Sequence, residues 1–307
     1  MKLSIGVACL NEKDKIGEFL DSISKQTVKP ELVIIDGGST DGTLDIIGAF
    51  QKENKNIHVY KETGKYKSPS NARNLSLKNA TGQAFTFMDV DETISPNYAE
   101  AIVKAFKKNP KADRIEIKLG MIEPPRFWEM LRTVSFYRDN RKKIRSILKG
   151  KSPMTGNVYR RSYLMKKYPV FDPKLGFGED RIVGEKLSVK PVFSKEKAWR
   201  FRTSSFLNLS QFTRRYKWYG RTIPPYIART KDIKMLLSYT LAVISPFTIV
   251  LLLIPFLRGL YFSIQWFFIH KNWKVFSDPF LEVLAWIYIS IGFFQYLIGI
   301  GSNRGRF

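Results

Sequence analysis

Two aspartates one residue apart, Asp89 and Asp91, follow the apolar run AFTFM in the stretch FMDVDE. Residues i and i+2 of a strand point to the same side, so a strand here would direct both carboxylates at one place. Two such charges repel each other unless a cation lies between them. The spacing predicts a site for a hard, oxygen-liganded ion, Mn²⁺ or Mg²⁺, and the alternative is an ordinary solvated loop.

A calcium-binding loop is a further interpretation, because Asp89, Asp91 and Glu100 occupy positions 1, 3 and 12 of the EF-hand spacing. The sixth position of that loop requires glycine, but the residue here is Ile94. A strand rather than a helix is also expected before the loop. We therefore set the EF-hand aside.

The composition is that of a folded, basic chain. Of 307 residues, 44% are hydrophobic, which excludes a disordered chain, and the formal charge of +24 indicates an anionic partner such as nucleic acid, a phosphorylated ligand or an acidic membrane. A single cysteine, Cys9, excludes an intramolecular disulfide and a cysteine-cluster zinc site, and it fits a reducing compartment.

Apolar runs alternate with helical patterns through the first 120 residues. Strands are expected at LSIGVACL, ELVIID, IHVYKE, AFTFMDV and ADRIEIKL, with helices between them, such as NARNLSLKNA. This alternation predicts an α/β fold, a mostly parallel Rossmann-like sheet with helices on both faces. Ligands of such sheets bind beyond the carboxyl ends of the strands, where CLNE, DGGSTDGT and DVDE would meet.

Four motifs in this order resemble the inverting family 2 glycosyltransferases of the GT-A fold. They are a strand ending in Asn-Glu, Asp-x-Gly-Ser-Thr-Asp-Gly-Thr, an Ala-Arg-Asn before Asp-x-Asp, and a later Gly-Glu-Asp. The resemblance covers residues 1 to about 220 and implies a GT-A catalytic domain over 1–232. Two departures are the missing Tyr of the usual Pro-x-Tyr-Asn-Glu at residues 8–12, and Asp36-Gly37 in place of the frequent Asp-Asp.

The resemblance implies a GDP- or UDP-linked sugar donor. The loop after the first strand and the acid after the second would contact the base and ribose, and Asp91 would hold the metal ion, with Asp89 near the ribose or the metal. The cation would offset the negative charge that grows on the diphosphate as the glycosyl bond breaks. The implied donor-binding residues in this part are Ala8, Cys9, Leu10, Glu12, Asp36, Arg73 and Asp89.

The stretch FDPKLGFGEDRIVGEKL supplies the implied catalytic carboxylates, Glu179 and Asp180. By resemblance, Asp180 is the general base that removes the proton from the acceptor hydroxyl as this oxygen attacks the anomeric carbon. Acidic residues that stabilise a helix N-terminus are the alternative explanation.

The stretch SQFTRRYKWYG resembles the Gln-x-x-Arg-Trp motif of membrane-bound synthases such as cellulose synthase, with the Trp displaced by an insertion. The resemblance adds Gln211 to the donor site, Arg214 or Arg215 as a bidentate clamp on the diphosphate, and Trp218 as a surface on which a sugar stacks. A basic and aromatic belt beside a membrane is the alternative.

Two uncharged runs, 235–257 and 283–302, each reach the ~20 residues needed to cross a bilayer. They predict a transmembrane domain over 233–307, with basic flanks and the catalytic domain on the cytoplasmic side. The aromatic segment 259–282 is expected to lie in the membrane interface rather than to form a third span. The basic stretch 126–149 is expected to be an amphipathic helix, either solvated or lying on the headgroups.

These expectations describe a metal-dependent enzyme of the cell membrane that adds a hexose, mannose or glucose, to a hydroxyl of a lipid-linked saccharide. A general base favours this acceptor, because a polyprenyl phosphate is already anionic and needs none. The alternatives are a polyprenyl-phosphate sugar synthase and a non-catalytic, basic, membrane-tethered binding protein. No nucleic-acid partner is expected, since the sequence contains no recognisable binding motif for one.

Overall fold

The computed structural model describes residues 1–121, 157–175, 178–187, 189–202 and 208–300. The chain forms two compact units, the first made of Met1–Ile122 and Arg145–Thr203 and the second including Ser204–Gly305. The expected domain boundary at residue 232 lies inside the second unit, because helix α8 (Leu209–Thr230) belongs with the helices that follow it. The basic stretch 126–149 lies outside the described residues.

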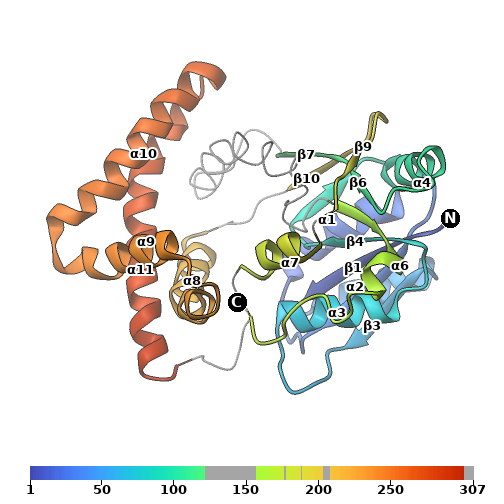
Figure 1. Cartoon of the computed structure of the whole chain (residues 1–307), viewed down its shortest axis with the longest axis horizontal. Coiled ribbons are helices and arrows are strands. Elements are labelled where there is room, and N and C mark those ends of the chain that lie inside the picture. The colour runs from blue at the N-terminus through green and yellow to red at the C-terminus, as the bar shows by residue number, and fades with distance from the viewer. Residues whose placement is uncertain (122–156, 176–177, 188, 203–207, 301–307) are drawn as a thin grey trace. The chain divides into compact units, whose positions relative to one another are not determined.

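The first unit is built on a sheet with the strand order β3-β2-β1-β4-β8-β6-β9 (Figure 1). The first four strands in the sequence pair in parallel, as the alternation predicts, whereas β8 runs antiparallel to both β4 and β6. The strands are β1 (Leu3–Cys9), β2 (Glu31–Asp36), β3 (Ile57–Lys61), β4 (Ala84–Met88), β6 (Arg114–Glu116), β8 (Asn157–Arg160) and β9 (Val192–Phe193).

A second, three-stranded sheet has the order β5-β10-β7, where β10 (Trp199–Arg202) is antiparallel to β5 (Glu92–Ile94) and parallel to β7 (Lys118–Met121). The expected strand ADRIEIKL is divided between the two sheets, as β6 and β7. The second sheet is not predicted from the sequence, because it pairs short strands about a hundred residues apart.

Helices cover both faces of the main sheet, which confirms the expected α/β fold. On one face, α1 (Lys13–Ser24), α2 (Thr43–Glu53) and α4 (Tyr98–Lys108) share a core with side chains such as Ile5 and Val7. Successive strand residues point to opposite faces, so Leu32 of β2 packs into this core and the next residue, Val33, packs into the core on the other face. The helices of this second face are α3 (Pro69–Asn79), α6 (Arg161–Met165) and α7 (Glu179–Leu187).

Gly6 on β1 allows α3 to lie unusually close to the sheet. A Cβ atom at this position would be 2.4 Å from Ser76 Oγ and 2.5 Å from the ring of Phe85, distances that no real side chain tolerates. Ser68 caps the same helix, since its side chain accepts a hydrogen bond from the amide of Asn71 at 3.1 Å. The helix that carries Arg73 is therefore fixed both at its start and along its length.

The second unit contains α8, α9 (Ile233–Ile244), α10 (Ile249–His270) and α11 (Asp278–Leu297). Two stretches, Val250–Phe268 and Trp273–Leu297, are long and apolar enough to cross a membrane. The helix boundaries differ from those expected from the sequence. The run 235–257 is not one helix, because a 3₁₀ turn at Ser245–Phe247 separates α9 from α10, and Pro246 within it has no amide hydrogen to continue a helix.

The segment 259–282 also differs from the expected interfacial helix. Its first part, up to His270, continues α10, and a 3₁₀ turn at Trp273–Ser277 then leads into α11. The run 283–302 lies in α11 as far as Leu297. The two candidate spans are therefore shifted along the sequence relative to the expected ones.

Helices α8 and α11 touch through their backbones. A Cβ atom on Gly220 would lie 2.1 Å from the carbonyl oxygen of Ile289, and one on Gly292 would lie 2.0 Å from that of Lys217. Beside this crossing, Arg221 donates a hydrogen bond to Gln295 Oε1 at 2.6 Å. Glycine at both positions is what allows this close packing.

Candidate active site

Three motif loops meet at one edge of the main sheet. The strands β2, β1 and β4 are neighbours and run parallel, so their carboxyl ends point the same way. The loops CLNE, DGGSTDGT and DVDE leave from these three ends. The predicted convergence of these motifs is therefore confirmed.

The first two loops are joined by hydrogen bonds. The Asn11 amide donates to Ser39 Oγ at 2.9 Å, and Asn11 Oδ1 accepts from the Thr40 amide at 2.9 Å. The Glu12 amide donates to Thr43 Oγ1 at 2.9 Å. Asn11 has a φ of 54°, a left-handed conformation that asparagine tolerates better than most residues.

These joining residues lie within the quoted motifs but were not predicted as site residues. Asn, Asp, Ser and Thr are the side chains that most readily bond to nearby backbone, so the run of them in DGGSTDGT was the available signal. The residues not predicted are Asn11, Ser39, Thr40, Asp41 and Thr43.

The carboxylate of Asp36 shapes its own loop. It accepts hydrogen bonds from the Gly38 amide at 2.8 Å and from the Ser39 amide and hydroxyl at 3.1 and 2.6 Å. The Cys9 side chain is fully buried in the core, while Ala8, Leu10 and Glu12 are partly exposed. The contacts of these residues with a nucleotide remain predictions.

The DVDE stretch differs from the expected strand. Strand β4 ends at Met88 and β5 begins at Glu92, so Asp89 and Asp91 lie in the turn between them and do not share a strand face. Asp89 points toward Arg73 with its side chain one-third exposed, whereas Asp91 is buried with 7% of its surface exposed. The two carboxylates are therefore in different surroundings and suit different partners.

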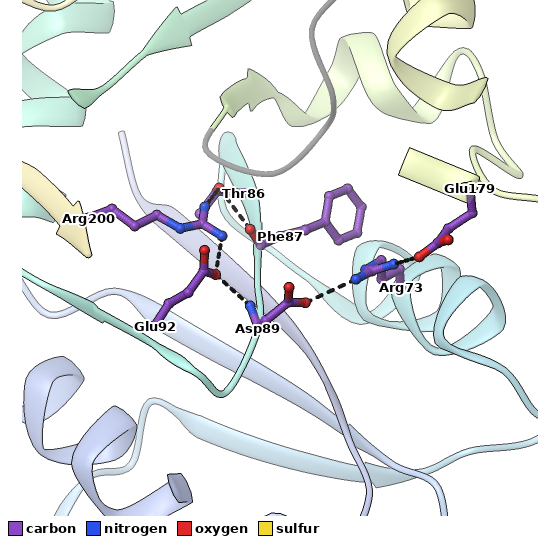
Figure 2. A network of polar contacts seen from close by, with 7 residues as sticks. All are labelled: Arg73, Thr86, Phe87, Asp89, Glu92, Glu179 and Arg200. Carbon is purple, nitrogen blue, oxygen red and sulfur yellow. Dashed lines mark hydrogen bonds and ion pairs between the residues drawn. The ribbon is translucent and has the colours of Figure 1, made fainter. Parts of the chain in front are cut away.

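Arg73 connects the DVDE turn with the Gly-Glu-Asp motif (Figure 2). Its Nη2 donates to Asp89 Oδ1 at 3.0 Å, and its Nη1 forms an ion pair with Glu179. Burial alone would lower the pKa of Arg73, but Asp89, Glu179 and Asp180 raise it above its ordinary value. Arg73 is thus a permanent cation between two carboxylate motifs. Asp89 of DVDE follows it by 16 residues and Glu179 of Gly-Glu-Asp by 106.

Glu179 and Asp180 are the first residues of α7, after Gly178 at a φ of 70°. Burial raises the pKa of Glu179 to about 7, with Arg73 opposing this shift and Asp180 adding to it. Asp180 itself is partly exposed. The structure therefore places the predicted base at an accessible position beside a carboxyl group that titrates near neutrality.

Asp89 is also held through its main chain. Its amide donates to Glu92 Oε2 at 2.8 Å, and Glu92 forms an ion pair with Arg200 of β10 (Figure 2). Both side chains of this pair are 1% exposed. The sequence analysis missed Arg200, because no local pattern connects it with a motif 108 residues away.

The residues of the Gln-x-x-Arg region lie on α8 in the second unit. Asn208 caps this helix by accepting a hydrogen bond from the Gln211 amide at 3.0 Å. Arg214 is exposed and Trp218 is buried, with its ring centroid 5.4 Å from that of Tyr219. The roles of Gln211, Arg214, Arg215 and Trp218 toward the donor remain predictions.

The oxygen donors of the DVDE turn fit a magnesium or manganese ion. Mg²⁺ is commonly held by one or two carboxylates together with substrate phosphates and water. Within the described residues, no group of three or more His, Cys, Asp or Glu side chains gathers at one place. By the family resemblance Asp91 would supply the main protein ligand, and Asp89, whose Oδ1 bonds to Arg73 Nη2, would lie near the ribose or the metal.

Comparison with known proteins assigns the chain to a family. Residues 4–166 match "Glycosyl transferase family 2", and the chain therefore belongs to glycosyltransferase family 2. A 126-residue segment is 32% identical to the poly(ribitol-phosphate) beta-glucosyltransferase of Bacillus spizizenii, which is 40% of this chain but only 19% of that protein. The family and this relative are glycosyltransferases, so the chain is an enzyme of the glycosyltransferase class.

Solved structures share the fold. Staphylococcus aureus TarS residues 1–349, in complex with UDP-GlcNAc, matches with a TM-score of 0.52 and 23% identity, covering 73% of this chain and 66% of that one. The mannosyltransferase PcManGT of Pyrobaculum calidifontis, in complex with GDP-Man and Mn²⁺, matches with a TM-score of 0.57 and 16% identity, covering 94% of this chain and 87% of that one. These similarities identify the fold of the first unit as GT-A.

Proposed function

We propose that the protein is an inverting, metal-dependent hexosyltransferase. It moves mannose or glucose from a GDP- or UDP-linked donor to a hydroxyl of a lipid-linked saccharide at the cytoplasmic face of the cell membrane. The observation that carries this proposal is the bridge from Arg73 to both Asp89 and Glu179. It joins the turn predicted to face the donor to the helix that carries the predicted base, Asp180.

Asp180 suits the role of general base. It is partly exposed, and the positive charge of Arg73 lies within electrostatic reach of it. In the proposed reaction it accepts the proton of the acceptor hydroxyl as that oxygen bonds to the anomeric carbon. The bond from this carbon to the diphosphate breaks at the same time, and the nucleoside diphosphate leaves with both bonding electrons.

Asp91 suits the role of metal ligand. A bound Mg²⁺ or Mn²⁺ supplies positive charge against the charge that develops on the leaving diphosphate. Asp91 lies in the turn between β4 and β5, and its side chain is buried. The solved fold relatives bound to UDP-GlcNAc and to GDP-Man with Mn²⁺ are consistent with this assignment of donor and metal.

The apolar helices support a membrane-bound acceptor. Large apolar side chains on α10 are exposed, including Val250 at 72%, Leu257 at 58% and Phe268 at 66%. Exposed apolar surface on this scale marks contact with lipid or with a protein partner. With a general base in the same chain, the acceptor group is a hydroxyl rather than a phosphate, since a phosphate is already ionised.

Two variants of the full-length protein in detergent test the proposal. Asp91→Ala should abolish metal-dependent nucleotide binding together with transfer. Asp180→Asn should leave nucleotide binding intact while transfer falls by about 10²-fold or more. Nucleotide titrations with Mn²⁺ measure binding, and assays with UDP- and GDP-linked hexoses measure transfer. Asp21→Asn is the matched control, because Asp21 is a half-exposed aspartate of α1.

The two acceptors are distinguished in the same assay by offering a lipid-linked disaccharide beside a polyprenyl phosphate. Near-normal transfer by Asp180→Asn to the saccharide would show that the base is wrongly assigned. Transfer to the polyprenyl phosphate alone would favour the lipid-phosphate sugar synthase. Metal-dependent nucleotide binding by Asp91→Ala would remove this turn from the metal site.

A further inference from the structure

We infer that Arg200 and Glu92 are positioning residues for the donor-binding turn, holding Asp89 from the side opposite Arg73. Arg200 belongs to the second sheet and lies outside the four motifs that define the family resemblance. The consequence for catalysis rests on the proposed function. The consequence for the conformation of the turn does not, so the two can be tested separately.

The Arg200 guanidinium reaches both sides of the DVDE turn. Through Nη2 it pairs with Glu92, the residue that follows the turn, and through Nη1 it approaches Thr86 Oγ1 on β4 at 3.4 Å. Glu92 in turn accepts the amide hydrogen of Asp89 at 2.8 Å. The strand before the turn, the turn itself and the strand after it are therefore tied to one side chain.

Charges of alternating sign continue across the turn (Figure 2). Arg200 pairs with Glu92, Glu92 holds the amide of Asp89, and the carboxylate of Asp89 pairs with Arg73, which also pairs with Glu179. Asp89 is in the middle, so its main chain and its side chain are held by different partners. Asp91 follows two residues later in the same turn.

Stability alone does not account for the buried Arg200–Glu92 pair. Removing two charges from water costs several kcal/mol per ion, and a well-packed apolar pair of similar size is often as stable or more stable. A positioning function explains why charged groups occupy this place, since an apolar pair offers no acceptor for the Asp89 amide. A site held loosely by about 1 Å can lose ~10²-fold in rate.

The test compares two buried arginines of the first unit. Arg200→Met removes the pair beside the turn. Arg114→Met removes a guanidinium that is also 1% exposed and pairs with Glu116 at 2.9 Å, but on β6. Arg200→Lys keeps one charge and restores part of the pairing. The first readout is hydrogen exchange of the Asp89 amide in the full chain, which requires no sugar transfer.

The second readout is transfer kinetics per folded molecule. We expect Arg200→Met to raise Asp89 exchange by about tenfold or more and to lower kcat by about 10²-fold. Arg200→Lys should recover part of both losses. Arg114→Met should leave Asp89 exchange and kcat within about twofold of the wild type, although it lowers overall stability.

Equal Asp89 exchange in Arg200→Met and Arg114→Met would overturn the inference, leaving Arg200 with a structural role only. If Arg200→Met does not fold, Arg200→Gln and Glu92→Ala take its place, since the first removes the charge of the pair and the second leaves no side-chain acceptor for the Asp89 amide. Wild-type exchange in both would overturn the inference equally. The two claims can fail separately. If Arg200→Met exchanges the Asp89 amide faster but the wild-type protein transfers no sugar, the positioning of the turn is supported and the proposed function is contradicted.

Discussion

Glu31 and Glu179 are buried glutamates at opposite edges of the central sheet, and their pKa values shift in opposite directions. Glu31 begins β2 at the amino edge, where its pKa is lowered to about 2. Glu179 begins α7, which Arg73 ties to the carboxyl edge, and its pKa is raised to about 7. Both side chains are nearly inaccessible to water, but more protein surrounds the Glu179 carboxylate, so burial raises its pKa more strongly, and the partners of Glu31 account for the opposite shift there.

The hydrogen bonds around Glu31 account for its low pKa. Burial alone would raise it, but Ser4, and Thr81 through both its hydroxyl at 2.6 Å and its amide at 2.8 Å, donate to the carboxylate. The Lys2 ammonium forms an ion pair with Glu31, with Nζ 3.7 Å from Oε1, and its charge also lowers the pKa. Donors that favour the charged form outweigh desolvation at this edge.

Glu179 has fewer such partners. Arg73 is its cation, but Arg73 also pairs with Asp89, and the neighbouring Asp180 adds negative charge. The two edges therefore differ in the number of donors available for each buried negative charge. The amino edge favours a fixed ionised group that ties strands together, whereas the carboxyl edge keeps a group that titrates near neutral pH, as reactions require.

Removing the cation at each edge should produce the largest contrast. Arg73→Met leaves Asp89, Glu179 and Asp180 without their shared positive charge, so we expect transfer to fall by about 10²-fold or more. Lys2→Met, the corresponding change beside Glu31, should leave transfer unchanged because Lys2 is exposed and distant from the site. Measurements of kcat/KM on both variants test this. Comparable losses would show that the cation at the carboxyl edge has no special role in transfer.

The reverse contrast concerns stability. Glu31→Gln removes the charge that its donors favour, and a shift from the ordinary 4.5 to about 2 corresponds to about 3 kcal/mol at pH 7. We expect hydrogen exchange of the β1 and β2 amides to accelerate accordingly, with transfer per folded molecule unaltered. Unchanged protection of these strands would show that the donors around Glu31 do not stabilise the fold.

The two glutamates should also give opposite pH dependences. The folded pKa of Glu31 is lowered, so its contribution to stability is present above about 4.5 and is lost as pH falls toward 2. The folded pKa of Glu179 is raised, so its contribution is present below about 4.5 and is lost as pH rises through 7. Stability profiles of Glu31→Gln and Glu179→Gln against the wild type should therefore diverge on opposite sides of pH 4.5.

The smallest expected effect is that of a single donor. Ser4→Ala removes one hydroxyl that donates to Glu31 and accepts from the Gly82 amide at 2.8 Å. We expect a loss of about 1 kcal/mol in stability and no change in transfer. Calorimetry of the full chain in detergent measures the first, and a loss larger than that of Glu31→Gln would contradict the expectation that Ser4 is only one of several donors to Glu31.

Local patterns were sufficient to predict the positions of β1 to β4 and the loops that follow them. Continuous apolar runs such as LVII in β2 and AFTFM in β4 depend on neighbouring residues alone, so they are visible in one sequence. The order of the motifs then determined which side chains gather at the carboxyl edge. Arg73 was predicted only as a donor-binding residue, and its bridge to Asp89 and Glu179 was not predicted, because the sequence does not show which acids an arginine meets.

Long-range pairing was beyond the reach of these patterns. The pairing of β10 with β5 joins residues about a hundred positions apart, so neither the second sheet nor the contact of Arg200 with Glu92 leaves a local signal. The Asp89–Asp91 turn was expected to be strand, because periodicity does not reveal where pairing stops. The prediction of a single span over 235–257 was drawn from length and hydropathy alone, which do not register the helix break at Pro246.

The close crossing of α8 and α11 depends on glycine at both contact positions. The carbonyl oxygens of Ile289 and Lys217 occupy the space that side chains at Gly220 and Gly292 would need, so a larger residue at either position would force the two helices apart. Helix α8, which carries Gln211, Arg214 and Arg215, would then shift relative to the apolar helix α11.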